Sequence, residues 1–148
     1  MIYTAKIEQT SAYQKRMKYI AETDSFIQKN YDSLFYARSF KQPYGWIKES
    51  GTPTQRHLDV IIMTDKEYDL GDEERVKIIG VFLRNDGDNK LVAVEENRAV
   101  NDLSELSENE REDLHRLYPR ADKGEGWFGR DAAEKVIKVF FQKYKKGL

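Results

Sequence analysis

Apolar residues are densest in the middle of the chain, in two runs at residues 76–83 and 91–94. Both runs are rich in Val and Ile and have the length of strands rather than helices. The segment DGDNK, at residues 86–90, lies between them. Asp-Gly favours a tight hairpin turn, because both residues tolerate the positive φ that such turns require. The pattern therefore predicts a central β-hairpin, and residues 75–84 are its most strongly indicated strand.

The apolar pattern is weaker before this hairpin. Tyr13, Met17 and Ile20 have the spacing of one helix face, which predicts a short helix. Residues 34–40 (LFYARSF) have the aromatic, β-favouring composition of a strand, and residues 58–63 (LDVIIM) predict a short apolar strand. The acidic segment that follows the second of these is expected to be a solvated loop.

Helical spacing takes over after residue 101. Ser107 and Glu110 fit a capping box, and Pro119 marks the end of the helix that they begin. A second helix is predicted after the Gly-rich link 123–129, with Asp131 as its cap. The apolar stripe of this helix is Ala133, Val136, Ile137, Phe140 and Tyr144. The cations that suit its C-terminal end are Lys143, Lys145 and Lys146.

Strands gathered before helices indicate an α+β fold that is mainly β, such as a small closed barrel with the two C-terminal helices packed outside. The chain has 148 residues, and we find no repeat or linker that would divide it. A single domain over residues 1–148 is therefore expected.

Composition narrows the possible partners. Charged residues make up 34% of the chain, yet the net charge is −1 and the pI is about 6.2, which argues against nucleic-acid binding through bulk charge. The chain has no cysteine, so any metal is expected to be bound by oxygen ligands. No apolar run approaches the roughly 18 residues of a membrane span, and we expect a soluble, cytoplasmic protein without a membrane partner.

The turn at residues 86–90 has two interpretations. It can be a solvated turn, which is the usual role of such residues. Alternatively, Asp86 and Asp88 hold a divalent cation while Lys90 meets an anion, because carboxylate oxygens are suitable ligands for hard cations.

The order of several short segments along the chain resembles that of a known protein family. LFYARSF, PYGWI, LDVII, RVKIIGVF, DGDNKLVAV and VNDLSEL are followed by a helix ending in Tyr118, by Gly-Trp and by an Ala-containing helix. This series, over residues 34–146, resembles the family I inorganic pyrophosphatases. The resemblance implies a five-stranded OB-like β-barrel, Mg²⁺ as cofactor, pyrophosphate or a related phosphoanhydride as substrate, and assembly as a homo-oligomer.

The resemblance also implies roles for individual residues. Asp59, Asp86 and Asp88 are similar to the family's metal-binding, catalytic carboxylates. In a multi-metal site such carboxylates hold cations that stabilise charge on the leaving phosphate. The residues expected to contact the substrate are Arg38, Tyr44, Lys90 and Tyr118.

One motif departs from the family. Its signature reads Asp-Gly-Asp-Pro-x-Asp, whereas residues 54–59 here read TQRHLD, so Thr54 and Arg56 replace two aspartates. Arg56 cannot act as a base, because a guanidinium is not deprotonated near neutral pH.

Two hypotheses follow. In the first, the protein is a divergent magnesium-dependent pyrophosphatase in which Arg56 contacts the substrate directly. In the second, it is a non-catalytic relative that binds a phosphate-bearing ligand or serves as an assembly partner.

Overall fold

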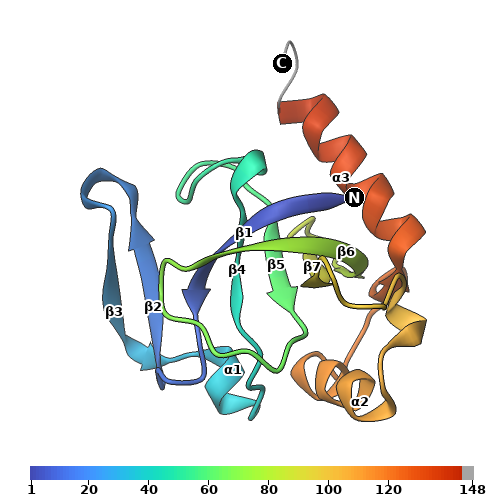
Figure 1. The fold of residues 1–148 in the computed structure, drawn as a ribbon, viewed down its shortest axis with the longest axis horizontal. Coiled ribbons are helices and arrows are strands. Elements are labelled where there is room, and N and C mark those ends of the chain that lie inside the picture. The colour runs from blue at the N-terminus through green and yellow to red at the C-terminus, as the bar shows by residue number, and fades with distance from the viewer. Residues whose placement is uncertain (145–148) are drawn as a thin grey trace.

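The computed structural model describes residues 1–144, which form eight strands, three α-helices and three short 3₁₀ helices. Figure 1 shows the strands gathered into one body with the two longer helices outside it. In chain order the elements are β1 (Ile2–Gln9), β2 (Lys15–Ile20), η1 (Ala21–Thr23), β3 (Ser25–Asp32), α1 (Leu34–Ala37), β4 (Tyr44–Ile47), η2 (Lys48–Ser50), β5 (Asp59–Ile62), β6 (Glu73–Leu83), β7 (Lys90–Glu95), η3 (Leu103–Glu105), α2 (Glu108–Leu117), β8 (Gly126–Gly129) and α3 (Arg130–Tyr144).

Five strands close into a barrel in the order β1-β4-β5-β7-β6, and β6 pairs back onto β1. The long strand β6 makes this closure possible, because its first half pairs with β1 and its second half pairs with β8. The pairing of β5 with β7 is parallel, and the other barrel pairings are antiparallel. This closed, mixed and mainly β architecture confirms the predicted fold class.

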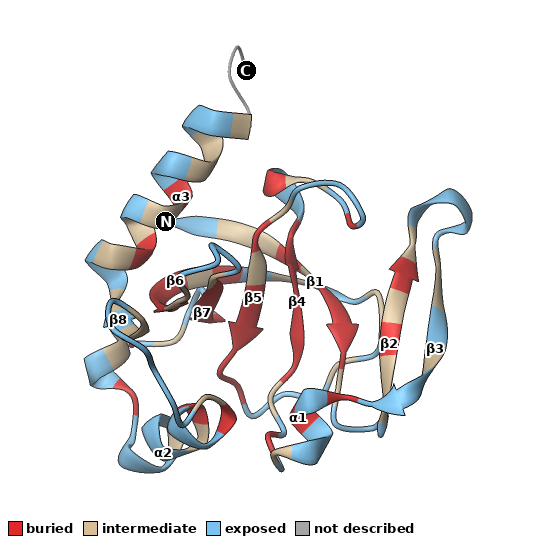
Figure 2. Ribbon diagram, turned by 180° about the vertical axis from the view of Figure 1, so that it is seen from behind, coloured by how far each residue is buried: buried red, intermediate tan, exposed pale blue. Residues whose placement is uncertain are grey.

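The core has two parts, one on each side of the barrel wall. On β5, Val60 and Ile62 belong to the part that contains Ala133 and Ile137 of α3. Ile61 belongs to the other part, which includes residues of α1 and α2. Figure 2 shows the barrel strands as the most deeply buried elements. Because alternate residues point to opposite faces, burial on both faces explains the unbroken apolar runs.

A ribbon of two strands, β2 and β3, stands beside the barrel. The helix expected over residues 13–20 is wrong, because this segment forms β2. In β2 the side chains of Met17 and Tyr19 are buried, whereas the intervening Lys18 is only partly covered. Burial therefore alternates with a period of two, as in a strand, although Tyr13, Met17 and Ile20 also have the spacing of a helix face.

The strand expected over residues 34–40 is also wrong, because residues 34–37 form the short helix α1. Ser33 causes the change, since its hydroxyl accepts a hydrogen bond from the backbone N–H of Phe35 and caps the helix. Phe35 and Phe40 then pack edge to face, with ring centroids 5.2 Å apart. The aromatic content of this segment did not distinguish the expected strand from the short helix that forms.

Other local predictions are confirmed. The β6–β7 hairpin spans the turn at residues 86–88, and Ser107 and Glu110 form the capping box of α2. The second C-terminal helix also forms, as α3, but Asp131 is not its cap: Asp131 lies inside the first turn, and the side chain of Asp102 accepts a hydrogen bond from the Arg130 N–H. Lys145 and Lys146 fall outside the described residues. Within residues 1–144 no helix is long and apolar enough to cross a membrane.

Candidate functional site

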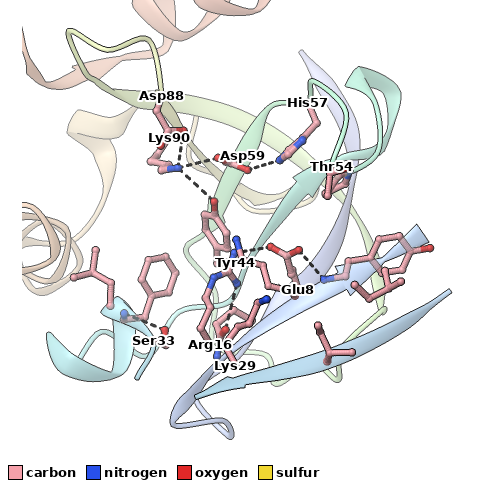
Figure 3. Close-up of a pocket in the computed structure, with 18 of the residues that line it drawn as sticks. Glu8, Arg16, Lys29, Ser33, Tyr44, Thr54, His57, Asp59, Asp88 and Lys90 are labelled. Carbon is pink, nitrogen blue, oxygen red and sulfur yellow. Dashed lines mark hydrogen bonds and ion pairs between the residues drawn. The ribbon is translucent and has the colours of Figure 1, made fainter. Parts of the chain in front are cut away.

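A cleft of about 670 Å³ opens between the barrel and the β2–β3 ribbon. Figure 3 shows its polar side chains converging from both sides. Three carboxylates line it, Glu8, Asp59 and Asp88. Five lysine or arginine side chains also line it, namely Arg16, Lys18, Lys29, Arg84 and Lys90. The cleft therefore carries an excess of positive charge, although the whole chain has a net charge of −1.

Lys90 is the central cation of the cleft. Its Nζ lies 2.8 Å from Asp59 Oδ2, 2.9 Å from Asp88 Oδ1 and 3.4 Å from the hydroxyl of Tyr44. The topology brings these groups together. Asp59 and Lys90 are the first residues of the parallel strands β5 and β7 and pair directly in register. Tyr44 comes from β4, the other neighbour of β5.

His57 adds a second cation beside Asp59. Its Nε2 lies 2.9 Å from Asp59 Oδ1, and its Nδ1 lies 2.7 Å from the carbonyl oxygen of Gln55. Both of these partners can only accept hydrogen bonds, so both ring nitrogens must carry a proton. His57 is therefore an imidazolium in this arrangement and has no lone pair with which to act as a base.

The pKa values of these groups reflect their mutual contacts. Burial opposes ionisation of Asp59, but the hydrogen bond from His57 and the ammonium of Lys90 outweigh it and hold the pKa of Asp59 well below its usual range. Burial also opposes the charged forms of His57 and Lys90, yet contacts with carboxylates, and for His57 also with the Gln55 carbonyl, raise both pKa values. The contacts thus favour the charged forms of all three groups, and a carboxylate as acidic as Asp59 is a weak proton acceptor.

The ribbon supplies a second group of charges that sequence reasoning missed. Arg16 of β2 donates to Glu8 Oε1 over 2.8 Å, and Glu8 Oε2 accepts from the backbone N–H of Tyr19 over 3.1 Å. The guanidinium of Arg16 also lies over the ring of Tyr44, with 5.6 Å between the guanidinium carbon and the ring centroid. Such stacking favours arginine over lysine. The incorrect helix prediction hid Lys18, whereas Lys29 lies on β3, outside the segment of that prediction, and no motif in the sequence pointed to it.

Arg84, at the end of β6, faces the central turn. Its guanidinium lies 3.4 Å from Asp86 Oδ2 and 3.8 Å from Asp88 Oδ2. Asp86 Oδ1 accepts a hydrogen bond from the backbone N–H of Asp88, as in an Asx turn. More than half of the Asp86 side chain is exposed, and Asp86 does not line the cleft but an adjoining groove.

The remaining expected site residues are divided between locations. Tyr118 lines the cleft, and its ring stacks on Phe82 at 4.6 Å. Arg38 lies at the end of α1, where its guanidinium donates to the backbone carbonyl of Leu117 rather than lining the cleft. Arg56 lines the adjoining groove and lies over the ring of Tyr144 at 4.6 Å.

The carboxylates of the cleft do not fit a multi-metal centre. Within residues 1–144, no three His, Asp or Glu side chains are grouped so that they could hold a metal ion. Both oxygens of Asp59 are bound by protein cations, and Asp88 is bound by Lys90 and approached by Arg84. Charges fixed on the protein thus occupy the positions around these carboxylates.

Comparisons with known proteins agree on the family. The family described as inorganic pyrophosphatase matches residues 5–145. An inorganic pyrophosphatase from Neisseria gonorrhoeae has 21% identity and a TM-score of 0.76, over 98% of this chain and 92% of that chain. The enzyme from Ehrlichia chaffeensis has 19% identity and a TM-score of 0.72, over 93% and 92%. The enzyme from Thermus thermophilus has 17% identity and a TM-score of 0.71, over 97% and 91%.

No curated protein matches the sequence of this chain. The family match nevertheless covers nearly the whole chain, and the solved structures share its fold from end to end. The chain therefore belongs to the inorganic pyrophosphatase family.

Proposed function

We propose that the cleft binds pyrophosphate, or a closely related phosphoanhydride, on side-chain cations rather than on magnesium. The observation that supports this proposal most directly is how the carboxylates of the cleft are paired with its cations. Asp59 and Asp88 are matched by Lys90 and His57, and Glu8 is matched by Arg16, which leaves Lys18, Lys29 and Arg84 in excess over the carboxylates that line the cleft. Within residues 1–144, Lys18 and Lys29 have no ion pair with a carboxylate, and Arg84 lies 3.4 Å from Asp86 and 3.8 Å from Asp88.

The arrangement suits an anion with several oxygens. Arginine presents a planar fork that binds phosphate oxygens through two hydrogen bonds at once. Arg84 is held loosely, at 3.4 Å and 3.8 Å from its carboxylates, so it can turn to an anion at little cost. The three N–H donors of Lys90 are taken by Asp59, Asp88 and the Tyr44 hydroxyl, so Lys90 neutralises carboxylates of the cleft and leaves the anion to the other cations.

A second candidate function is hydrolysis of the bound anhydride, with magnesium supplying charge neutralisation. Family membership favours it, as do the carboxylates of Asp59 and Asp88 at the cleft. Two features oppose it. Thr54 stands in the cleft where the family signature has an aspartate, and neither Asp59 nor His57 is a good base. Binding is therefore the function that the geometry supports better.

Calorimetry with pyrophosphate, once with a chelator and once with magnesium, tests the proposal. We expect binding in the chelator that weakens as salt rises, because fixed charges are screened by ions. Lys29→Gln should weaken it severalfold. Lys138→Gln is the matched control, since it removes the same charge from an exposed position on α3. Absence of pyrophosphate binding in both buffers would overturn the proposal.

Phosphate release, measured beside an Asp88→Ala control, distinguishes the second candidate. Magnesium-dependent turnover that the control lacks, together with binding only in magnesium, would favour hydrolysis over binding on fixed cations. The homo-oligomer implied by the resemblance and the cytoplasmic location expected from the sequence stay predictions. Light scattering of the purified protein measures the first of them.

A further inference from the structure

The cleft has an apolar end that a bare pyrophosphate would leave uncovered. Ile20 and Ile27 line it together with the cations, and Ile27 is 42% exposed. A single exposed isoleucine needs no explanation, but two that line one cleft beside fixed cations resemble the mixed lining of a small-molecule site. The cleft volume of about 670 Å³ is also within the range of pockets that hold organic ligands, about 300–1,000 Å³.

The ribbon register orders these residues along one face. Alternation places Arg16, Lys18 and Ile20 on one face of β2, and Ile27 and Lys29 on one face of β3. Lys18 pairs with Ile27, and Ile20 pairs with Ser25 next to the tip of the hairpin. The face is therefore cationic near the base of the ribbon and apolar toward its tip.

The distance between the cations and the isoleucines along this face suits a ligand that has a charged part and an apolar part. From Arg16 to Ile20 is four residues, or about 13 Å at 3.3 Å per residue, and from Lys29 to Ile27 is about 7 Å. A diphosphate bound by Arg16, Lys29 and Arg84 thus leaves Ile20 and Ile27 beyond one of its ends. Leu34, Phe35 and Pro53 also line the cleft, so its lining is apolar in part at other points too.

We infer that the ligand of this cleft is a diphosphate monoester, in which one end of the diphosphate carries an apolar organic group that lies against Ile20 and Ile27. This inference rests on the proposed anion binding and names the class of ligand. Covering apolar surface that is otherwise in water adds affinity without adding charge. An organic diphosphate should therefore bind more tightly than pyrophosphate, although its esterified end carries less charge.

Calorimetry in a chelator with three probes tests the inference. The probes are pyrophosphate, ADP as a nucleoside diphosphate, and dimethylallyl diphosphate as an alkyl diphosphate. We expect at least one of the two esters to bind about tenfold more tightly than pyrophosphate, which corresponds to covering roughly 50 Å² of apolar surface. Preference for ADP would identify a planar base as the organic group, and preference for the alkyl ester would identify a hydrocarbon.

Ile27→Ser should remove most of this advantage and leave pyrophosphate affinity unchanged. Ile2→Ser is the matched control, because Ile2 is 46% exposed on β1 and does not line the cleft. Equal or weaker binding of both esters, or an equal loss for all three probes in Ile27→Ser, would overturn the inference while pyrophosphate binding still supports the proposed function. If no probe binds, both proposals are wrong.

Discussion

Replacing Asp59 by asparagine tests whether this carboxylate serves as a counter-charge or as a ligand. The substitution keeps the shape and removes the charge that lies between His57 and Lys90. The amide oxygen can still accept from Lys90, but the amide nitrogen can only donate, so it must face an unprotonated His57 Nε2. We therefore expect the pKa of His57 to fall in Asp59→Asn, and the ring to become neutral at pH 7.

The cost in stability follows from burial. Removing one member of a buried ion pair destabilises proteins by about 3–5 kcal/mol, because the other charge is left without a partner. The Asp59 side chain is 15% exposed, and Lys90 keeps Asp88 at 2.9 Å, so the lower end of that range applies. We expect a loss of about 3 kcal/mol in the free energy of unfolding. At pH 7 the cleft loses the negative charge of Asp59 and the positive charge of His57 together, so its net charge and its affinity for pyrophosphate should stay nearly unchanged.

Three measurements check this prediction. Urea unfolding gives the stability, calorimetry gives pyrophosphate affinity, and an NMR titration gives the pKa of His57. His115, the other histidine of the chain, is exposed on α2 and serves as an internal control. An unchanged His57 pKa together with complete loss of pyrophosphate binding would refute the reasoning, because Asp59 would then contact the ligand or a metal bound with it.

Three further predictions concern charge and helix capping. The pKa of His57 is raised in the folded state, so the stabilisation that the charged ring provides is complete below the unfolded pKa of about 6.5 and is lost as pH rises through the folded pKa. The urea midpoints of the wild type and of His57→Gln should therefore converge above the folded pKa. Ser107→Ala should lower stability by about 1 kcal/mol by removing the capping box of α2, as measured by thermal unfolding. Restoring aspartate at both Thr54 and Arg56 should make pyrophosphate binding magnesium-dependent and create or raise phosphate release; if neither changes, the missing aspartates are not what separates this cleft from a metal site.

Local signals in the sequence predicted the structure well where the backbone responds to neighbours in the chain. The hairpin at residues 86–90 depends on Asp-Gly, and the start of α2 depends on Ser107 and Glu110, so each is decided within a few residues. The pairing of Asp59 with Lys90 is different. It requires β5 and β7 to be parallel, and only the closed barrel reveals that their first residues are neighbours.

Two of the missed cations were hidden by a wrong period. Helical spacing around Met17 concealed a strand, so Arg16 and Lys18 were not recognised as two residues on one face of a ribbon. A related error affected Arg38, which was expected in a strand but follows the short helix α1 and binds the carbonyl of Leu117. Both errors arose because short segments rich in aromatic and charged residues fit either period, and contacts with the barrel decide between them.

The replaced aspartates and the cationic ribbon belong to one electrostatic balance. With Thr54 and Arg56 at two signature positions, the carboxylates left at the end of the barrel are few enough to be matched by Lys90 and His57. A polyanion entering the cleft then meets the remaining cations directly, whereas more carboxylates would repel it unless metal ions intervened. Loss of acidic residues and binding on protein cations are therefore physically consistent with each other, and the affinity for pyrophosphate in a chelator depends on both.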